Sequence, residues 1–191
     1  KALGSLHVHQ GDVLTFDFHQ LAQAPQKLRI LGNLPYNIST PLIFHLLNQL
    51  DVIQDMHFML QQEVVDRMAA TPNSKTYGRL SVMVQYHCKV ESLFVIPPQA
   101  FTPAPKVYSK LVRLIPHTSL PYQVNNAEVF AEIVRLAFNQ RRKTIRNSLK
   151  EKVSDALFEQ LGLSPTLRAE NLSVQDYVNL ANALDMSDER A

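Results

Sequence analysis

Six of the eleven prolines of this chain fall between residues 97 and 121. Proline lacks a backbone N–H and fixes its own φ angle, so it is poorly tolerated in helix interiors and central strands. This stretch therefore cannot be continuous regular structure, and its last part, residues 116–126, is the best linker candidate. A chain of 191 residues has room for one medium domain with an appendage or for two small domains.

Before the linker, short apolar runs alternate with amphipathic segments. Three runs read as strands: 6–12, 27–31 and 56–61. Two segments read as helices, 39–50 and 62–70, and Ser39 or Thr40 is the expected cap of the first. Residues 78–87 favour a helix, and 108–116 alternate well enough for a strand. Strands alternating with helices predict an α/β fold with a mostly parallel sheet.

After the linker the pattern is helical. Residues 127–140 place Val129, Ile133, Leu136 and Ala137 on one stripe. Further helices are expected near 144–149 and 154–161, and a last one over 173–184 with Ser173 as its cap. We therefore expect an α/β domain over residues 1–118 and a small all-α domain over residues 119–191.

Charge and composition narrow the functional classes. The formal net charge is only +2, yet residues 141–152 hold six basic side chains against Glu151 alone, which makes a local basic patch. The single cysteine, Cys88, excludes an internal disulfide and fits a reducing compartment. We expect no membrane span, because no apolar run is long enough for one.

The segment GNLPY, residues 32–36, ends a predicted strand with an amide, a proline turn and an aromatic ring. Ligands of parallel sheets bind at the carboxyl ends of strands. The Asn33 side chain and a backbone carbonyl fixed by Pro35 could accept both N–H bonds of one amino group, while Tyr36 offers a face for stacking. These features describe a pocket for the N6 edge of adenine. An ordinary turn followed by a packed tyrosine is the alternative.

Several motifs in the same order resemble one family over nearly the whole chain. They are QGDVL, GNLPYNIS, LQQEVVDRM, YGRLSV, FTPAPKV, AFNQRRKTIRNSL and AENLSVQDYVNLANAL. Together they resemble the bacterial small-subunit ribosomal RNA adenine N6,N6-dimethyltransferases. The resemblance implies a Rossmann-like methyltransferase sheet that uses S-adenosylmethionine, followed by a helical RNA-binding domain.

The resemblance also implies roles for individual residues. Asn33, with the backbone of Leu34 and Pro35, would hold the target amino group, and Asn33 would also lie near the methyl donor. Tyr36 would stack on the flipped base, and Phe101 would close its other side. Asp12 would contact the adenine end of S-adenosylmethionine, although a turn residue after a strand is the commoner reading of an aspartate there.

Basic residues would bind the RNA. The segment RRKTIR would contact phosphates through charge and bidentate hydrogen bonds. A solvated helix end is the alternative for this segment, because basic side chains also favour helix C-termini. The expected RNA-binding residues are Lys106, Arg141, Arg142, Lys143 and Arg146.

The resemblance places part of the cofactor site upstream of Lys1. The five glycines, at positions 4, 11, 32, 78 and 162, form no G-x-G pair, whereas the family has a glycine-rich turn after its first strand. We therefore expect that the first strand–helix units are missing and that this chain alone neither binds S-adenosylmethionine tightly nor methylates RNA. Tyr108 departs from the small or polar residue usual after PKV; we expect it to lie behind the site and to alter local packing.

The expected activity is dimethylation of two adjacent adenosines in the 3′-terminal hairpin of small-subunit ribosomal RNA, with a role in ribosome assembly. The substrate would be a 30S precursor in the cytoplasm, and the full-length enzyme would be a monomer. We expect no metal site, because His7 and His9 lack a third ligand. The alternatives are a non-catalytic assembly factor that binds RNA, and a large-subunit ribosomal RNA adenine methyltransferase.

Overall fold

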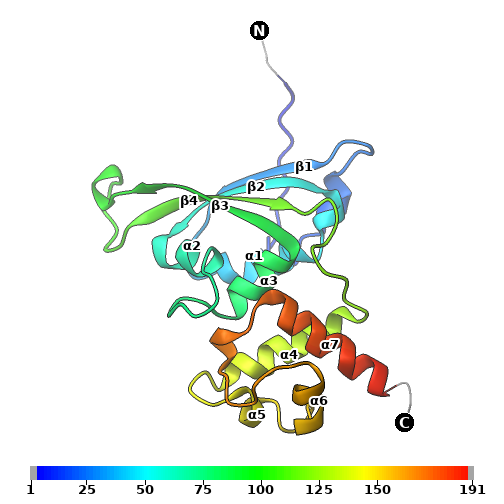
Figure 1. The fold of residues 1–191 in the computed structure, drawn as a ribbon. Coiled ribbons are helices and arrows are strands. Elements are labelled where there is room, and N and C mark those ends of the chain that lie inside the picture. The colour runs from blue at the N-terminus through cyan, green and yellow to red at the C-terminus, as the bar shows by residue number, and fades with distance from the viewer. Residues whose placement is uncertain (1–3, 189–191) are drawn as a thin grey trace.

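The computed structural model describes residues 4–188, which form a four-stranded sheet and a group of helices below it (Figure 1). The strands are β1 (Leu28–Asn33), β2 (Ile53–Gln61), β3 (Cys88–Ile96) and β4 (Ser109–Pro116). Their order in the sheet is β1-β2-β4-β3. β1 and β2 run parallel, whereas β4 is antiparallel to both of its neighbours.

The expectation of a mostly parallel sheet is therefore wrong for these strands. β3 and β4 are consecutive strands joined by the proline-rich loop 97–108, and they pair as a long antiparallel ribbon that adds to the sheet through β4. β3 has no counterpart among the predicted strands. Its sequence, CKVESLFVI, alternates only over the first four residues, and most of its residues are exposed or half-buried, so no sustained strand pattern reveals it.

Three helices cover one face of the sheet (Figure 1). They are α1 (Ser39–Leu47), α2 (Gln62–Met68) and α3 (Arg79–His87), and each confirms a predicted helix. Their apolar sides, with residues such as Leu46, Val65 and Val82, are buried together with Phe58 of the sheet. This packing fixes the carboxyl end of β1 above α1.

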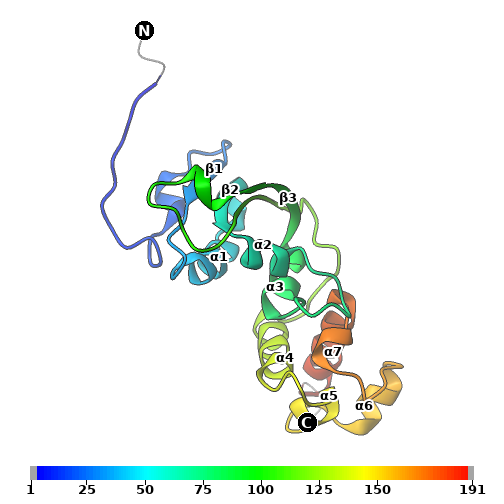
Figure 2. The same cartoon turned by 90° about the vertical axis from the view of Figure 1, so that its left-hand side faces the viewer.

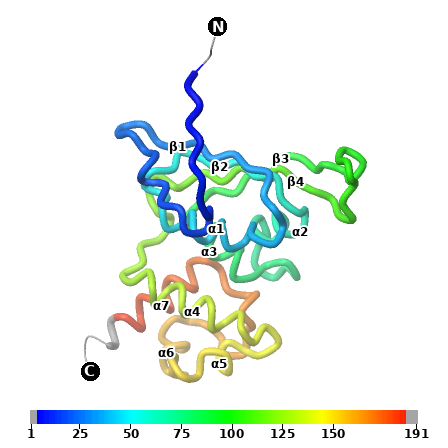
Figure 3. Tube along the Cα trace, turned by 180° about the vertical axis from the view of Figure 1, so that it is seen from behind, coloured from blue at the N-terminus to red at the C-terminus, as the bar shows by residue number. Residues whose placement is uncertain are grey.

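Residues 6–12 do not form the expected strand. Leu6 is 89% exposed and Val8 is 84% exposed, and the segment rises away from the rest of the chain (Figure 3). An extended segment becomes a strand only when another strand pairs with it, and no described strand lies beside this one. The prediction of a strand over residues 6–12 is therefore wrong for the described part of the chain.

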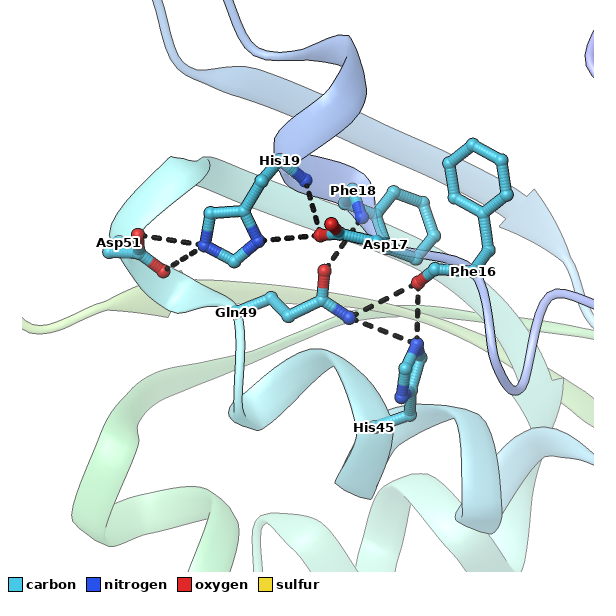
Figure 4. Close-up of polar contacts among 7 residues, drawn as sticks. All are labelled: Phe16, Asp17, Phe18, His19, His45, Gln49 and Asp51. Carbon is cyan, nitrogen blue, oxygen red and sulfur yellow. Dashed lines mark hydrogen bonds and ion pairs between the residues drawn. The ribbon is translucent and has the colours of Figure 1, made fainter.

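The segment that follows is attached to α1. A 3-10 helix, η1 (Phe18–Leu21), lies beside it, and the Gln49 side chain accepts a hydrogen bond from the Phe18 N–H at 2.7 Å (Figure 4). The Phe16 carbonyl accepts from Gln49 at 3.2 Å and lies 2.7 Å from the His45 Nε2 atom. These contacts satisfy backbone groups that no strand or helix pairs.

The C-terminal helices are α4 (Ala127–Asn139), α5 (Ile145–Ser148), α6 (Asp155–Gln160) and α7 (Val174–Asp188). The helices α4 and α7 pack side by side, with α5 and α6 on the side away from the sheet (Figure 2). The Asn126 side chain caps α4, and the Ser173 hydroxyl accepts a hydrogen bond from the Asp176 N–H, so the Ser173 cap is confirmed. The division of the chain after residue 118 stays a prediction.

Three further 3-10 helices connect these elements. They are η2 (Leu50–Val52), η3 (Pro98–Ala100) and η4 (Ala169–Asn171). The expected linker holds no helix or strand between the end of β4 and the start of α4. The linker thus connects the sheet and its covering helices, α1 to α3, to the C-terminal helices α4 to α7.

Candidate active site

The site begins where β1 ends. Asn33 is the last residue of β1 and pairs in register with Met59 of β2, and the next N–H, of Leu34, donates to the Met59 carbonyl at 3.3 Å. The Leu34 side chain folds back into the core. Gly32 leaves room for it, because a Cβ there would lie 2.7 Å from the Leu34 Cδ2 atom. Leu34 thus anchors the turn and leaves Asn33 exposed at the strand end.

A tight turn then positions Tyr36. The Pro35 carbonyl accepts from the Ile38 N–H at 3.2 Å, and the Tyr36 carbonyl accepts from the Ser39 hydroxyl at 3.0 Å. At the other end of the side chain, the Tyr36 hydroxyl lies 3.3 Å from the Oγ atom of Ser109 on β4. The expected cap of α1 by Ser39 or Thr40 is wrong, because Ile38 is the N-cap and Ser39 holds the turn instead. Tyr36 is therefore held at its backbone and at its hydroxyl, although the residue is 41% exposed.

The proline-rich loop 97–108 supplies the opposite wall. A cavity of about 330 Å³ lies between this loop, the turn and the ends of β2 and β4. All five residues predicted to be catalytic line it. The lining residues are Asn33, Leu34, Pro35, Tyr36, Met59, Phe101, Pro103, Pro105 and Ser109.

The residues that line the cavity favour an uncharged ligand. None of its nine lining residues carries a charged side chain, and two of them are aromatic. In residues 4–188, neither the Asn33 side chain nor the Leu34 carbonyl has a hydrogen-bond partner. An uncharged, partly aromatic cavity with two unused oxygen acceptors suits a flat, neutral ring that carries an amino group.

The predicted cofactor residue Asp12 lies outside this cavity. It is exposed, and its Oδ1 atom accepts from the Leu14 N–H at 2.9 Å in a turn rather than at a strand end. This geometry matches the turn-residue reading, so the role of Asp12 toward a cofactor stays a prediction.

The predicted RNA-binding residues divide into paired and unpaired groups. Arg141 donates to Glu170 at 2.9 Å, and Arg146 forms an ion pair with Asp155. Arg142 and Lys143 are exposed in the loop between α4 and α5, and neither has an ion-pair partner in the described part of the chain. Lys106 is also exposed, on the proline-rich loop. Of the five predicted RNA-binding residues, Arg142, Lys143 and Lys106 thus have no carboxylate partner within residues 4–188.

Sequence reasoning missed Met59, Pro103, Pro105 and Ser109 as lining residues. Met59 and Ser109 lie in strands whose neighbours only the sheet register reveals. The two prolines stand in FTPAPKV beside Phe101, and that motif was the signal available for them. No group of histidine, cysteine or acidic residues able to hold a metal occurs within residues 4–188. No described helix is long and apolar enough to cross a membrane.

Comparisons with known proteins agree with this chemistry. A family model described as Ribosomal RNA adenine dimethylase matches residues 3–186. The Ribosomal RNA small subunit methyltransferase A of Marinomonas sp. (strain MWYL1) is 56% identical over 93% of this chain and 66% of its own length. The protein of the same name from Vibrio vulnificus (strain YJ016) is 55% identical over 94% of this chain and 67% of its own length. The chain thus spans about two thirds of the length of these relatives.

Two solved structures share the fold. A dimethyladenosine transferase from Plasmodium falciparum superposes with a TM-score of 0.76 at 26% identity, over 95% of this chain and 72% of its own. The 23S rRNA methyltransferase ErmE superposes with a TM-score of 0.65 at 21% identity, over 91% of this chain and 70% of its own. The predicted fold class, a Rossmann-like methyltransferase sheet followed by a helical region, is confirmed.

Proposed function

Because this chain belongs to the ribosomal RNA adenine dimethylase family, we propose that it carries the target-base site of an enzyme that methylates N6 of adenosines in small-subunit ribosomal RNA. The observation that carries the proposal is the uncharged cavity at the end of β1, with the Asn33 amide and the Leu34 carbonyl beside the Tyr36 ring. Residues 1–118 hold this site, and residues 119–191 contribute to RNA binding. The substrate is a 30S precursor in the cytoplasm, methylated at two adjacent adenosines of its 3′-terminal hairpin.

The residues of the cavity act by positioning. The lone pair of the adenine N6 amine is delocalised into the ring, which makes the amine a poor nucleophile. The Asn33 side-chain oxygen and the Leu34 carbonyl accept its two N–H bonds, which favours a pyramidal nitrogen and localises the lone pair. Tyr36 and Phe101 hold the two faces of the base, so its orientation is fixed before reaction. The adenine must first leave its stack, and a hairpin loop makes that step less costly.

S-adenosylmethionine supplies an already activated methyl group when bound, so no strong general base is needed before attack. Asn33 fits its methyl end, because it is exposed at the carboxyl end of β1. The sequence contains no G-x-G pair for the remainder of the cofactor. The fit of this chain to the cofactor is therefore partial, and about a third of the length of the Marinomonas relative lies outside the stretch that it shares with this chain.

Methyl transfer tests the proposal. We would measure incorporation of labelled methyl groups into unmethylated small subunits by this chain alone and by a chimera in which the upstream part of the Marinomonas relative precedes it. We expect transfer by the chimera and none by the chain alone. In the chimera, Asn33→Ala should reduce transfer about 100-fold or more, since one of two positioning acceptors is lost.

Binding of the same RNA distinguishes a methyltransferase from a non-catalytic assembly factor that only binds RNA. Asn33→Ala should leave it nearly unchanged, because phosphate contacts dominate affinity. As a matched control, the double variant Arg142→Ala, Lys143→Ala should weaken binding and reduce its salt dependence. A chimera that binds RNA without transferring methyl groups would contradict the enzyme proposal and favour a non-catalytic assembly factor.

A further inference from the structure

Tyr108 forms one wall of a second cavity beside the first. The residue directly precedes β4, and its side chain is 51% exposed. The second cavity has a volume of about 610 Å³. Its lining residues are Gln61, Gln62, Glu63, Asp66, Lys106, Val107 and Tyr108. Tyr108 does not lie behind the first site with altered packing, as its sequence position suggested, but borders a separate hollow on the surface.

The two cavities are adjacent. The proline-rich loop passes from Pro105, which lines the first cavity, to Lys106, which lines the second. On the sheet, Gln61 of the second cavity pairs in register with Ser109 of the first. A nucleotide next to one whose base lies in the first cavity is therefore within reach of the second.

Tyr108 is held firmly although its ring is exposed. Its carbonyl accepts from the Gln62 N–H at 3.0 Å, and Ser109 next to it is buried. Lys110 then forms an ion pair of 2.9 Å with Asp66 of α2. In the described part of the chain, the Tyr108 ring has no aromatic or cationic partner. The backbone at Tyr108 is thus held in place, and its ring presents an exposed aromatic face.

The polar groups around this face match one nucleotide. Lys106 is exposed and offers a cation for a phosphate. The side-chain amides of Gln61 and Gln62 can pair with the edge of a base. Glu63 has no ion-pair partner within residues 4–188, and its carboxylate accepts hydrogen bonds from an exocyclic amine but repels a phosphate. The base is thus directed toward α2 and the phosphate toward Lys106.

We propose that the second cavity binds the nucleotide next to the target adenosine, with its base stacked on Tyr108 and its phosphate at Lys106. The inference rests on the proposed function and extends it by a second base-binding subsite. Holding the neighbouring base in place keeps the RNA strand open at the target, which favours entry of the adenine into the first cavity.

A double-mutant cycle tests this subsite. The probes are hairpin RNAs whose loop contains two adjacent adenosines, either intact or with an abasic site on the 5′ or the 3′ side of the target. Equilibrium binding of each RNA to the 191-residue chain is measured at one fixed salt concentration. Loss of one stacked base should weaken binding to the unchanged chain about tenfold on one of the two sides.

Tyr108→Ala should lose most of this discrimination, because the stacking is gone and only the edge contacts of Gln61 and Gln62 remain, whereas Tyr108→Phe should keep it in full. Phe94→Ala is the matched control, since Phe94 is 56% exposed on the same ribbon and lines neither cavity. Discrimination that is undiminished in Tyr108→Ala, or that is absent on both sides in the unchanged chain, would overturn the subsite alone. Failure of the unchanged chain to bind any of the RNAs would overturn the proposed function as well.

Discussion

His19 lies between two carboxylates and joins two short helices. Its Nδ1 atom is 2.8 Å from Asp17 of the same turn, and its Nε2 atom is 2.9 Å from Asp51 of η2 (Figure 4). A neutral imidazole has one N–H, so only the protonated ring can donate to both carboxylates. The hydrogen bonds to Asp17 and then Asp51 raise the pKa of His19 above its ordinary value of 6.5.

This bridge predicts a pH-dependent contribution to stability. A raised folded-state pKa means that the contribution of His19 is complete below pH 6.5 and is lost as the pH rises through the folded-state pKa. The hydrogen bonds from His19 lower the pKa of Asp17, so its contribution is lost only when the pH falls below 3.8. We expect His19→Gln to lower the urea midpoint more at about pH 5 than at about pH 9.

The effect should be small and weakened by salt, because all three side chains are exposed. In the Asp17→Asn, Asp51→Asn background, His19→Gln should cause no pH-dependent change. A midpoint difference that stays constant from acid to alkaline pH would show that the bridge adds nothing beyond packing.

At the scale of single residues, sequence reasoning brought together the residues that share one motif. Asn33 to Tyr36 are consecutive, and Phe101 is part of a second motif, so the resemblance could place both at one site. The family implied by these motifs is confirmed. Met59 and Ser109 could not be found in this way, because only strand pairing places them beside Asn33 and Tyr36. Tyr108 was noticed, but its exposure depends on where the loop meets α2.

At the scale of elements, a row of alternating charges crosses the sheet. Arg29 of β1 and Arg113 of β4 both donate to Asp55 of β2, at 2.8 Å and 2.9 Å. Arg113 also lies 3.6 Å from Glu91 of β3. Asp55 is 1% exposed, so burial raises the pKa of its carboxyl, but the hydrogen bonds from Arg29 and Arg113 outweigh burial and the pKa is lowered overall. The row connects all four strands in their observed order.

We expect Asp55→Asn to lower the free energy of unfolding by about 1–3 kcal/mol, because two arginines lose a buried counter-charge while remaining able to reach solvent. Urea denaturation at neutral pH measures this loss. The difference between the variant and the unchanged chain should shrink in acid. Because the pKa of Asp55 is lowered in the folded state, its stabilising contribution is complete above the ordinary pKa of 3.8 and is lost as the pH falls through the folded-state pKa.

Glu91→Gln is the control from the other end of the same row. Its ion pairs are partly exposed, so we expect little change. Equal losses in the two variants would mean that the row stabilises the sheet only through general surface electrostatics.

Elements with a strong period or a local cap could be predicted, as α4 with its apolar stripe and α7 with the Ser173 cap show. The mixed, largely antiparallel order of the sheet could not be predicted, because β3 is largely exposed and gains its structure from pairing with β4. The apolar run 6–12 illustrates the opposite error, since its pattern is that of a strand but no described strand pairs with it.

At the scale of the whole molecule, the sheet part and the helical part share one apolar core. Phe130 of α4 is 1% exposed, and its ring centroid lies 4.7 Å from that of Tyr86 in α3. Tyr77, in the loop before α3, contacts Phe138 of α4 with ring centroids 6.2 Å apart. The Asn73 N–H also donates to the Glu170 carbonyl at 2.8 Å, which joins the two parts through the backbone. Such a continuous core predicts a single cooperative unit.

The variant Phe158→Ala tests whether the two parts unfold as a single cooperative unit. Phe158 of α6 is fully buried within the helical part, so its removal should cost about 3–5 kcal/mol. If the molecule unfolds as one unit, amide hydrogen exchange in β2 should accelerate by the same factor as in α4, about 100-fold or more.

The variant Phe130→Ala, at the junction of the two parts, is the comparison. It should destabilise both parts by a similar amount but also loosen their coupling. Unchanged protection of β2 in Phe158→Ala, with α4 exchanging faster, would instead show that the sheet part and the helical part unfold independently.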